Sequence, residues 1–321
     1  MKIAIQISPQ SKSAYFQSYI DVAQKELAYL FEGLSCEYVC IGTLEFFFVH
    51  IDKDKLPDLL RLSFVQGVYA VNGEYLTPLA VFPNYRLHED FVFGSKYRGK
   101  TNETLTQLLI NVGLATIRND IPLSETTVFD PMCGRGTSLL WAMRYGIQSF
   151  GLEVDLKAME DIQRNLKKWT KIHRQKHSLR QSFLGVKPNK KKEGICIDFQ
   201  ADNTAIKAVQ GDCRSVRKVF KERMFSLIIT DIPYGVQHHV GKGTRNSLSV
   251  LRESIPIWKQ SLQKKGAMVI SFNRNLPKRN DLIEVCSSAG LSIVDFSIPH
   301  RMSESIVRDV VICKKDELYL S

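Results

Sequence analysis

The segment Asp231-Ile232-Pro233-Tyr234 brings together a carboxylate, a constrained backbone and an aromatic ring at the end of the apolar run 225–230. An exocyclic amine on a nucleobase is a poor nucleophile because its lone pair is delocalised into the ring. Asp231 and the carbonyl group of Ile232 can both accept the N–H groups of such an amine, which frees its lone pair for in-line attack on a methyl group. Tyr234 can stack on the base, which must leave its own stack to reach such a pocket. Positioning and electrostatics would supply most of the rate.

A glycine-containing turn provides a second group of residues. Asp130-Pro131-Met132-Cys133-Gly134-Arg135-Gly136-Thr137 follows an apolar strand and precedes a helix predicted over 139–145. A strand, a tight turn and a helix N-terminus form the nucleotide-binding corner of doubly wound folds. Leu139 stands where the dinucleotide fingerprint has its third glycine, which disfavours a pyrophosphate cofactor and, with it, an NAD-dependent oxidoreductase. Asp130 suits a cationic or amine-bearing ligand.

Acidic residues also follow the next two predicted strands. The second strand ends in Glu153, Val154 and Asp155, where an acid can accept hydrogen bonds from ribose hydroxyl groups. Glu153 is the favoured acceptor, whereas Asp155 can instead cap the following helix. Asp212, which precedes Cys213 after the third strand, can accept from an adenine amino group or serve as another helix cap.

Positive charge is concentrated in one segment. The chain has 44 Lys and Arg against 33 Asp and Glu, a formal charge of +11, and residues 164–192 hold eleven of these cations and no acid. Clustered cations release counterions from a nucleic-acid backbone, so we expect a nucleic-acid-binding surface, with a solvated helix and loop as the alternative. Trp169, His173 and His177 lie among the charges and can stack on bases or anchor the helix inward. The candidate phosphate-binding residues are Lys167, Lys168, Lys171, Arg174, Lys176, Arg180, Lys190, Lys191 and Lys192.

Hydrophobic periodicity predicts two structural units. The first 75 residues read as strand, helix, two strands around Gly42-Thr43, helix and strand, which is the ferredoxin-like βαββαβ order. Residues 76–95 are predicted to be a linker, since Tyr75 to Glu89 reads as a connector. The remaining chain, 96–321, alternates strands with helices, which predicts a doubly wound parallel α/β sheet with 164–192 as a basic insertion. The predicted strands are 126–129, 149–152, 205–209, 226–230, 267–272, 291–298 and 305–313, of which the last two are too close for a helical crossover and should pair antiparallel.

The composition restricts the class of protein. The chain has 321 residues, 44% of them hydrophobic, and no apolar run long enough to span a bilayer. The first residues lack the pattern of a signal peptide. Seven cysteines without a CxxC suit reduced thiols in a cytoplasm, and they disfavour both a disulfide framework and a structural zinc. We therefore expect a cytoplasmic protein that binds neither a metal nor a membrane.

Together, these motifs resemble class I S-adenosylmethionine-dependent methyltransferases, and within them the THUMP-associated tRNA guanine-N2 methyltransferase group. The resemblance lies in 130–137, in Asp231 to Gly235, and in 96–105 running on to Asn111, which looks like the group's pre-loop motif. It implies S-adenosylmethionine as cofactor, RNA, with tRNA favoured, as partner, and catalytic roles for Asp231, Ile232, Pro233 and Tyr234. The implied cofactor-binding residues are Thr101, Asp130, Pro131, Cys133, Gly134, Gly136, Thr137, Glu153, Val154, Asp212 and Cys213.

Two departures from this group keep alternatives open. Ile232 replaces the first proline of the group's Asp-Pro-Pro-Tyr-Gly, so the backbone at this position is not locked. The N-terminal region matches only the first part of the group's RNA-binding region. An RNA guanine-N2 methyltransferase ranks first, and an adenine-N6 methyltransferase acting on DNA or RNA ranks second. A protein-glutamine methyltransferase and a non-catalytic RNA-binding protein with a methyltransferase fold are the further alternatives.

Overall fold

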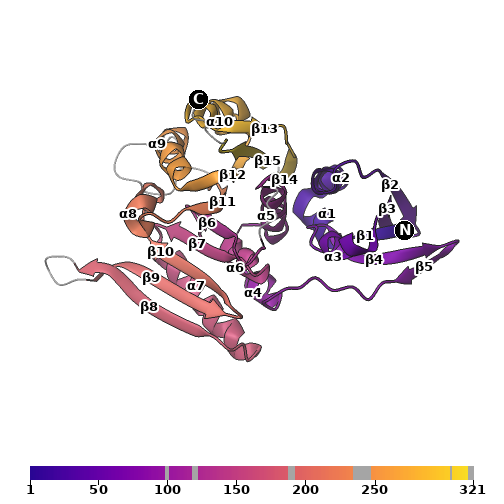
Figure 1. Cartoon of the computed structure of the whole chain (residues 1–321), viewed down its shortest axis with the longest axis horizontal. Helices are drawn as coiled ribbons and strands as arrows, with labels where there is room; N and C mark the ends of the chain where they lie inside the picture. Colours follow the sequence, from indigo (N-terminus) through magenta and orange to yellow (C-terminus); the bar gives the residue numbers. More distant parts are fainter. Residues whose placement is uncertain (98–100, 118–121, 187–191, 234–246, 304–305, 317–321) are drawn as a thin grey trace.

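The computed structural model describes residues 1–97, 101–117, 122–186, 192–233, 247–303 and 306–316. Two β-sheets, each covered by helices, lie side by side in the molecule (Figure 1). Within the described ranges, no helix is long and apolar enough to cross a membrane. All seven cysteines are free.

The N-terminal sheet has the strand order β2-β3-β1-β4-β5, and its first four strands follow the predicted ferredoxin-like arrangement. Two elements were not predicted. Helix α1 begins after Ser8, whose side chain accepts from the N–H of Gln10. Strand β5 turns the start of the predicted connector into a hairpin around Gly73, whose φ is +60°. The elements are β1 (Lys2–Ile7), α1 (Pro9–Tyr15), α2 (Tyr19–Leu30), β2 (Cys36–Ile41), β3 (Leu44–His50), α3 (Leu56–Leu59), β4 (Val65–Asn72) and β5 (Tyr75–Pro78).

The larger sheet has ten strands in the order β13-β15-β12-β11-β6-β7-β10-β9-β8, with β14 paired to β15. Strands β10, β7, β6, β11 and β12 run parallel and β15 runs antiparallel, so the predicted doubly wound sheet with an antiparallel last strand is confirmed. The strands are β6 (Thr127–Asp130), β7 (Gln148–Glu153), β8 (Ser178–Val186), β9 (Lys192–Ala201), β10 (Thr204–Gln210), β11 (Phe225–Asp231), β12 (Leu262–Asn273), β13 (Ser292–Val294), β14 (His300–Ser303) and β15 (Ile306–Lys314).

Helices cover both faces of this sheet. Alternate residues of each central strand point to opposite faces and belong to two separate buried clusters. Leu227 and Ile229 pack with the helices that follow and precede β6, whereas Ile228 packs on the opposite side. Helices α5, α6 and α7 lie on the first face, and α8, α9 and α10 on the second. Their bounds are α4 (Asp90–Phe93), α5 (Glu103–Ile117), α6 (Thr137–Arg144), α7 (Leu156–Ile172), α8 (Val216–Phe220), α9 (Ser247–Gln260) and α10 (Arg279–Ser288).

The basic segment differs from the helix and loop of its alternative interpretation. Only its first part belongs to helix α7, and the chain then returns as strand β8, which pairs antiparallel with β9 at the edge of the sheet. This two-strand ribbon extends away from the body of the protein (Figure 1). Gln181 replaces an apolar residue between Leu179 and Phe183 on one face of β8, which hides the strand in the sequence.

The two sheets are joined through a shared hydrophobic core. Ala14, Tyr15 and Val22 from the N-terminal helices belong to the same buried cluster as helix α5. Glu26 on α2 is fully buried at this joint, where it accepts from the side chain of Asn111 on α5 at 2.7 Å and from the N–H of Ser63 at 3.0 Å. Helix α5, which also packs on β11 and β12, is therefore held from both sides.

Candidate active site

The carboxyl ends of parallel strands bring four acidic residues to one edge of the sheet. Asp130 is the last residue of β6, Glu153 the last of β7 and Asp231 the last of β11, while Asp212 follows β10. In open α/β sheets, ligands bind outside this edge. Residues that are widely separated in the sequence are thus collected in one region.

Asp130 is fixed at the base of the glycine turn. The N–H of Met132 donates to its Oδ1 at 2.9 Å, and the hydroxyl group of Ser138 hydrogen-bonds to its Oδ2. Burial raises the pKa of Asp130 to about 7, and the nearby carboxylate of Glu153 adds to this effect. Asp130 is therefore oriented by the turn and by the first residues of α6.

The turn itself lies directly against β7. The N–H of Cys133 donates to the carbonyl of Leu152 at 2.9 Å, and a Cβ atom added to Gly151 would lie only 2.7 Å from the Cys133 sulfur. Burial raises the pKa of the Cys133 thiol well above its ordinary value, so this cysteine forms a wall of the turn and is not a nucleophile. Gly134 has a φ of +52°, and a Cβ there would meet nothing within 4 Å, so its backbone is open to a ligand.

Glu153 closes the turn from the tip of β7. Its Oε2 accepts from the N–H of Gly134 and its Oε1 from the N–H of Asp155, both at 2.8 Å. Each oxygen has a second lone pair, so a ribose hydroxyl group can still bind there. The next residue, Val154, is 50% exposed and offers an apolar surface beside it. Asp155 caps α7 by accepting from the N–H of Lys157, as its alternative interpretation predicts.

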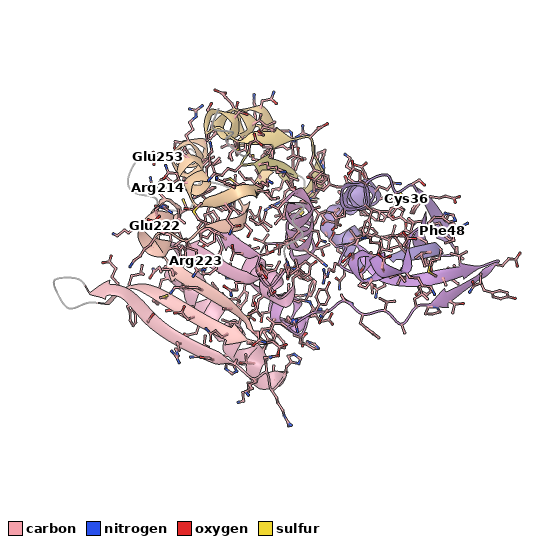
Figure 2. All side chains as sticks on the ribbon, viewed as in Figure 1. Cys36, Phe48, Arg214, Glu222, Arg223 and Glu253 are labelled. Carbon is pink, nitrogen blue, oxygen red and sulfur yellow. The ribbon has the colours of Figure 1, made fainter. Side chains whose placement is uncertain are left out.

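Asp212 is engaged within its own loop. Arg214 donates to both carboxylate oxygens of Asp212 at 2.8 Å and also pairs with Glu253 on α9 (Figure 2). These hydrogen bonds from Arg214 lower the pKa of Asp212. An adenine amino group would share Asp212 with Arg214. Cys213 lies next to it, with its sulfur 3.4 Å from the Ser254 hydroxyl oxygen.

Asp231 lies on the same face of the sheet as Asp130, and its side chain is 13% exposed. Thr101, Asp130, Cys133, Thr137 and Asp231 contribute to the lining of one small cavity. Ile232 is buried, and its N–H donates to the carbonyl of Ser271 at 2.9 Å, while Pro233 is exposed. Tyr234 lies outside the described residues.

Arg308 on β15 is a residue that the sequence did not assign to this site. Its side chain is only 3% exposed and contacts the Asp231 carboxylate. A charged pair, Arg308-Asp309, inside an otherwise apolar strand was the signal that could have indicated a buried role.

The residues at this edge of the sheet fit S-adenosylmethionine. Asp130, which lines the cavity of about 10 Å³ shared with Asp231, offers a carboxylate for an ammonium group. Outside that cavity, Gly134 offers an open backbone, Glu153 an acceptor for ribose and Val154 an apolar face for adenine.

The described candidate nucleic-acid-binding residues lie on α7, on the turn that follows it and on β8. Lys167, Lys168 and Lys171 are exposed on α7, Arg174 and Lys176 on the turn that follows, and Arg180 on β8. A groove of about 440 Å³ runs between α7 and the ribbon, with Arg164 and Lys167 among its lining residues. Lys190 and Lys191 lie outside the described residues, as does the side chain of Lys192.

The aromatic residues of this segment differ in burial and in the residues that they contact. Trp169 is buried and donates to the hydroxyl group of Ser95 at 2.9 Å, so it anchors α7 inward. His173 contacts the Asp90 carboxylate at 2.9 Å and stacks on His88 with ring centroids 3.8 Å apart. His177 is exposed.

Asp90, His88 and His173 are the one group within the described ranges whose atoms lie close enough to hold a metal ion. The two imidazole planes differ by only 20° in a stacked arrangement. Lone pairs in two nearly parallel planes do not converge on one ion, so this arrangement does not form a metal site. Instead, the cluster ties the segment before α5 to the end of α7.

Comparison with known proteins places this architecture in a family. The model of the RMKL-like methyltransferase domain family (UPF0020) matches residues 114–285, more than half of the chain. A search of curated protein sequences gave no match.

Three solved structures match this chain at low similarity. TrmN from Thermus thermophilus is 12% identical with a TM-score of 0.44, and the match covers 88% of this chain but only 60% of TrmN. A SAM-dependent methyltransferase from Agrobacterium tumefaciens is 14% identical with a TM-score of 0.46, covering 75% of this chain and 66% of that one. A methyltransferase from Pyrococcus furiosus is 15% identical with a TM-score of 0.43, covering 71% and 92%. With its glycine turn, its strand order and the family match, the chain belongs to the RMKL-like methyltransferase domain family and is a class I S-adenosylmethionine-dependent methyltransferase.

Proposed function

We propose that this methyltransferase modifies an exocyclic amine of a nucleobase in RNA, with N2 of a guanosine in tRNA as the favoured target. The observation that carries the proposal is the position of Asp231. Its carboxylate ends β11, shares a cavity with Asp130 of the cofactor turn, and remains partly exposed. An amine held by Asp231 would therefore lie next to the amino-acid end of the cofactor.

The residues at this edge would act by binding and orienting the amine. Asp231 accepts one N–H and the carbonyl group of Ile232 accepts the other, which draws the nitrogen toward a tetrahedral geometry. Bound S-adenosylmethionine supplies a methyl group on a positively charged sulfur, which keeps the electron pair of the broken C–S bond. The nitrogen loses one proton as it gains the methyl group, and Asp231 is placed to accept that proton.

A carboxylate at this position favours guanine over adenine. The Watson–Crick edge of guanine presents two adjacent donors, N1–H and N2–H, whereas adenine presents N6–H beside an acceptor nitrogen. A carboxylate has two acceptor oxygens and no donor, so it matches the guanine edge. Asp231 already contacts a guanidinium group, that of Arg308, which has the same arrangement of N–H donors around one carbon.

The positively charged surface supports an RNA substrate. Met159 and Glu160, in the first turn and a half of α7, line one end of the groove between α7 and the ribbon. They follow shortly after the proposed cofactor-binding end of β7 in the sequence. Arg164 and Lys167 line it beside the apolar Ile195 and Ile197, a combination that suits a phosphate backbone with an unstacked base. We propose that this groove and the other basic residues of 164–192 guide RNA to the catalytic edge.

The test offers tritiated S-adenosylmethionine to bulk tRNA, rRNA and DNA and then digests the products to nucleosides. Label in N2-methylguanosine from tRNA is the expected result, and label in N6-methyladenine would replace the proposal with the second alternative. Asp231→Ala should bind the cofactor with unchanged affinity and transfer methyl groups at least about 100-fold more slowly. Transfer at the wild-type rate by this variant would remove Asp231 from the mechanism. Absence of any transfer by the wild-type protein would favour a non-catalytic RNA-binding protein.

A further inference from the structure

Arg308 is a buried cation that contacts the carboxylate at the catalytic edge. It lies on β15, two strands away from β11, and extends across β12 to reach Asp231. One of its terminal nitrogens contacts Asp231 Oδ1 and donates to the hydroxyl group of Ser271 on β12 at 2.8 Å. Its position is therefore fixed by two neighbouring strands.

The groups that face Asp231 from the surrounding elements act on its charge in opposite directions. Burial, with a contribution from the like charge of Asp130 on β6, raises the pKa of Asp231 to about 8, against hydrogen bonds from Ser271 and Thr101. The Arg308 guanidinium is the cation in contact, and it favours the ionised carboxylate. Burial lowers the pKa of Arg308 to about 9, which leaves it positively charged at neutral pH.

We propose that Arg308 is a positioning residue for methyl transfer, which favours the ionised form of Asp231 and orients its carboxylate toward the target amine. This inference rests on the proposed function, in which Asp231 accepts an N–H of the nucleobase. A protonated carboxyl group would present a donor to that amine and could not receive its proton. Arg308 would thus act on the substrate through Asp231, without touching it.

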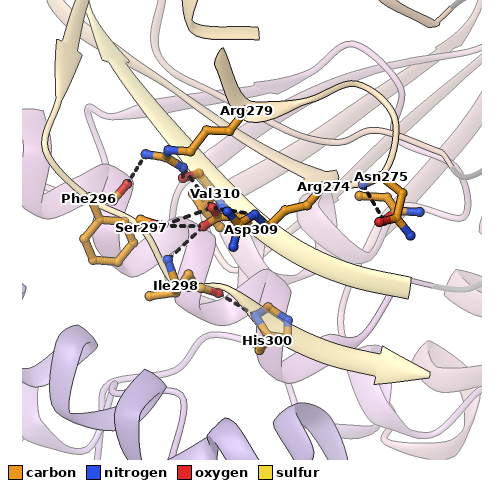
Figure 3. Close-up of polar contacts among 10 residues, drawn as sticks. Arg274, Asn275, Arg279, Phe296, Ser297, Ile298, His300, Asp309 and Val310 are labelled. Atoms are coloured by element: carbon orange, nitrogen blue, oxygen red, sulfur yellow. Dashed lines mark hydrogen bonds and ion pairs between the residues drawn. The ribbon is translucent and has the colours of Figure 1, made fainter. Parts of the chain in front are cut away.

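A neighbouring ion pair provides a matched control. Arg279 on α10 donates to Asp309 at 3.1 Å and to the carbonyl groups of Val310 and Phe296, both at 2.7 Å (Figure 3). Arg279 and Asp309 lie on the opposite face of the sheet from the cavity, in the cluster with α10. Loss of Arg279 should therefore affect folding without changing the pH dependence of methyl transfer.

The first experiment measures single-turnover methyl transfer to bulk tRNA between pH 6 and 9.5 for the wild type, Arg308→Met, Arg308→Lys and Arg279→Met. Loss of the adjacent cation should raise the pKa of Asp231 by at least about one unit above its wild-type value of about 8. Arg308→Met should therefore be about tenfold slower than the wild type at pH 7 and recover only as the pH rises through about 9. Arg308→Lys and Arg279→Met should keep the pH dependence of the wild type. Equal slowing of Arg308→Met at every pH would reduce Arg308 to a structural role and overturn the proposal.

A second experiment does not depend on catalysis and so separates this inference from the proposed function. In chemical unfolding, the stability of Arg308→Met should fall from pH 5 to about pH 9 by more than that of the wild type, because an acid with a raised folded-state pKa destabilises the fold as it ionises. Glu26 and Asp130 contribute to this decline in every variant, so Arg308→Met/Asp231→Asn should lack only the Asp231 contribution and decline less than Arg308→Met. If the two variants decline equally, Arg308 does not control the ionisation of Asp231, whatever the outcome of the transfer assay. If the double variant declines less but no RNA is methylated, the proposed function fails while the coupling of the two residues stands.

Discussion

Two ion pairs of the large sheet originate from adjacent residues of β15 yet differ in their surroundings. Arg308 points to the face of α5 and contacts Asp231, whereas Asp309 points to the opposite face and binds Arg279. Asp309 is fully buried and also accepts from the hydroxyl group of Ser297 and the N–H of Ile298 (Figure 3). Asp231 borders a cavity and is partly exposed.

The difference shows how one strand can serve both stability and chemistry. A carboxylate surrounded by donors has no capacity left for a ligand, and it holds β15 to α10 and to the segment before β14. A carboxylate with a cation on one side and a cavity on the other remains able to accept a substrate hydrogen bond. The period of two along a strand is what separates these roles onto opposite faces.

The largest effect on stability is expected where the closed pair is broken. Arg279→Met leaves Asp309 buried without its closest cation, so the free energy of unfolding should fall by about 3–5 kcal/mol in urea titration. Arg274 is 46% exposed and lies 3.9 Å from the same carboxylate, so Arg274→Met should cost less than about 1 kcal/mol. Equal losses for both variants would show that Arg279 has no special role.

Glu26 sharpens the comparison because it is buried with neutral donors in place of a cation. Burial raises its pKa from 4.5 to about 7, so the folded protein holds this proton more tightly than the unfolded chain. Stability should therefore fall as the pH rises from about 4.5 to about 7, by about 3 kcal/mol for this group. Glu26→Gln should remove that decline, measured by urea unfolding at several pH values. An unchanged pH dependence in this variant would assign the decline to other groups.

The smallest effect is expected from exposed charges. Arg164→Gln/Lys167→Gln should weaken the binding of bulk tRNA about tenfold at about 0.1 M salt. The slope of log affinity against log salt concentration should also become shallower, because up to about two fewer counterions are released on binding. Lys221→Gln/Lys264→Gln alters two exposed lysines near the starts of β11 and β12, at the opposite edge of the sheet, and is the matched control. Fluorescence anisotropy measures both, and equal weakening would remove the groove from the RNA path.

The sequence by itself determined the central strands of the large sheet and the order of the N-terminal one. Strand β11 and the second half of β12 are buried on both faces, so each contains an apolar run that can be recognised locally. The acids that follow these runs could also be located, since the end of a buried strand is visible in the sequence. The ribbon of β8 and β9 could not be recognised, because an exposed edge strand needs no apolar run.

Only the tertiary structure decided which partners the acids have. Arg308 contacts Asp231 from 77 residues away, and Asn111 reaches Glu26 from 85. Local sequence patterns report the face on which a side chain lies, but they carry no information on which distant side chain will meet it there. For the same reason, the sequence shows that Asp212 and Asp155 follow strands, as Asp231 and Glu153 end them, but not what binds them. In the fold, Arg214 binds Asp212 and Asp155 caps α7.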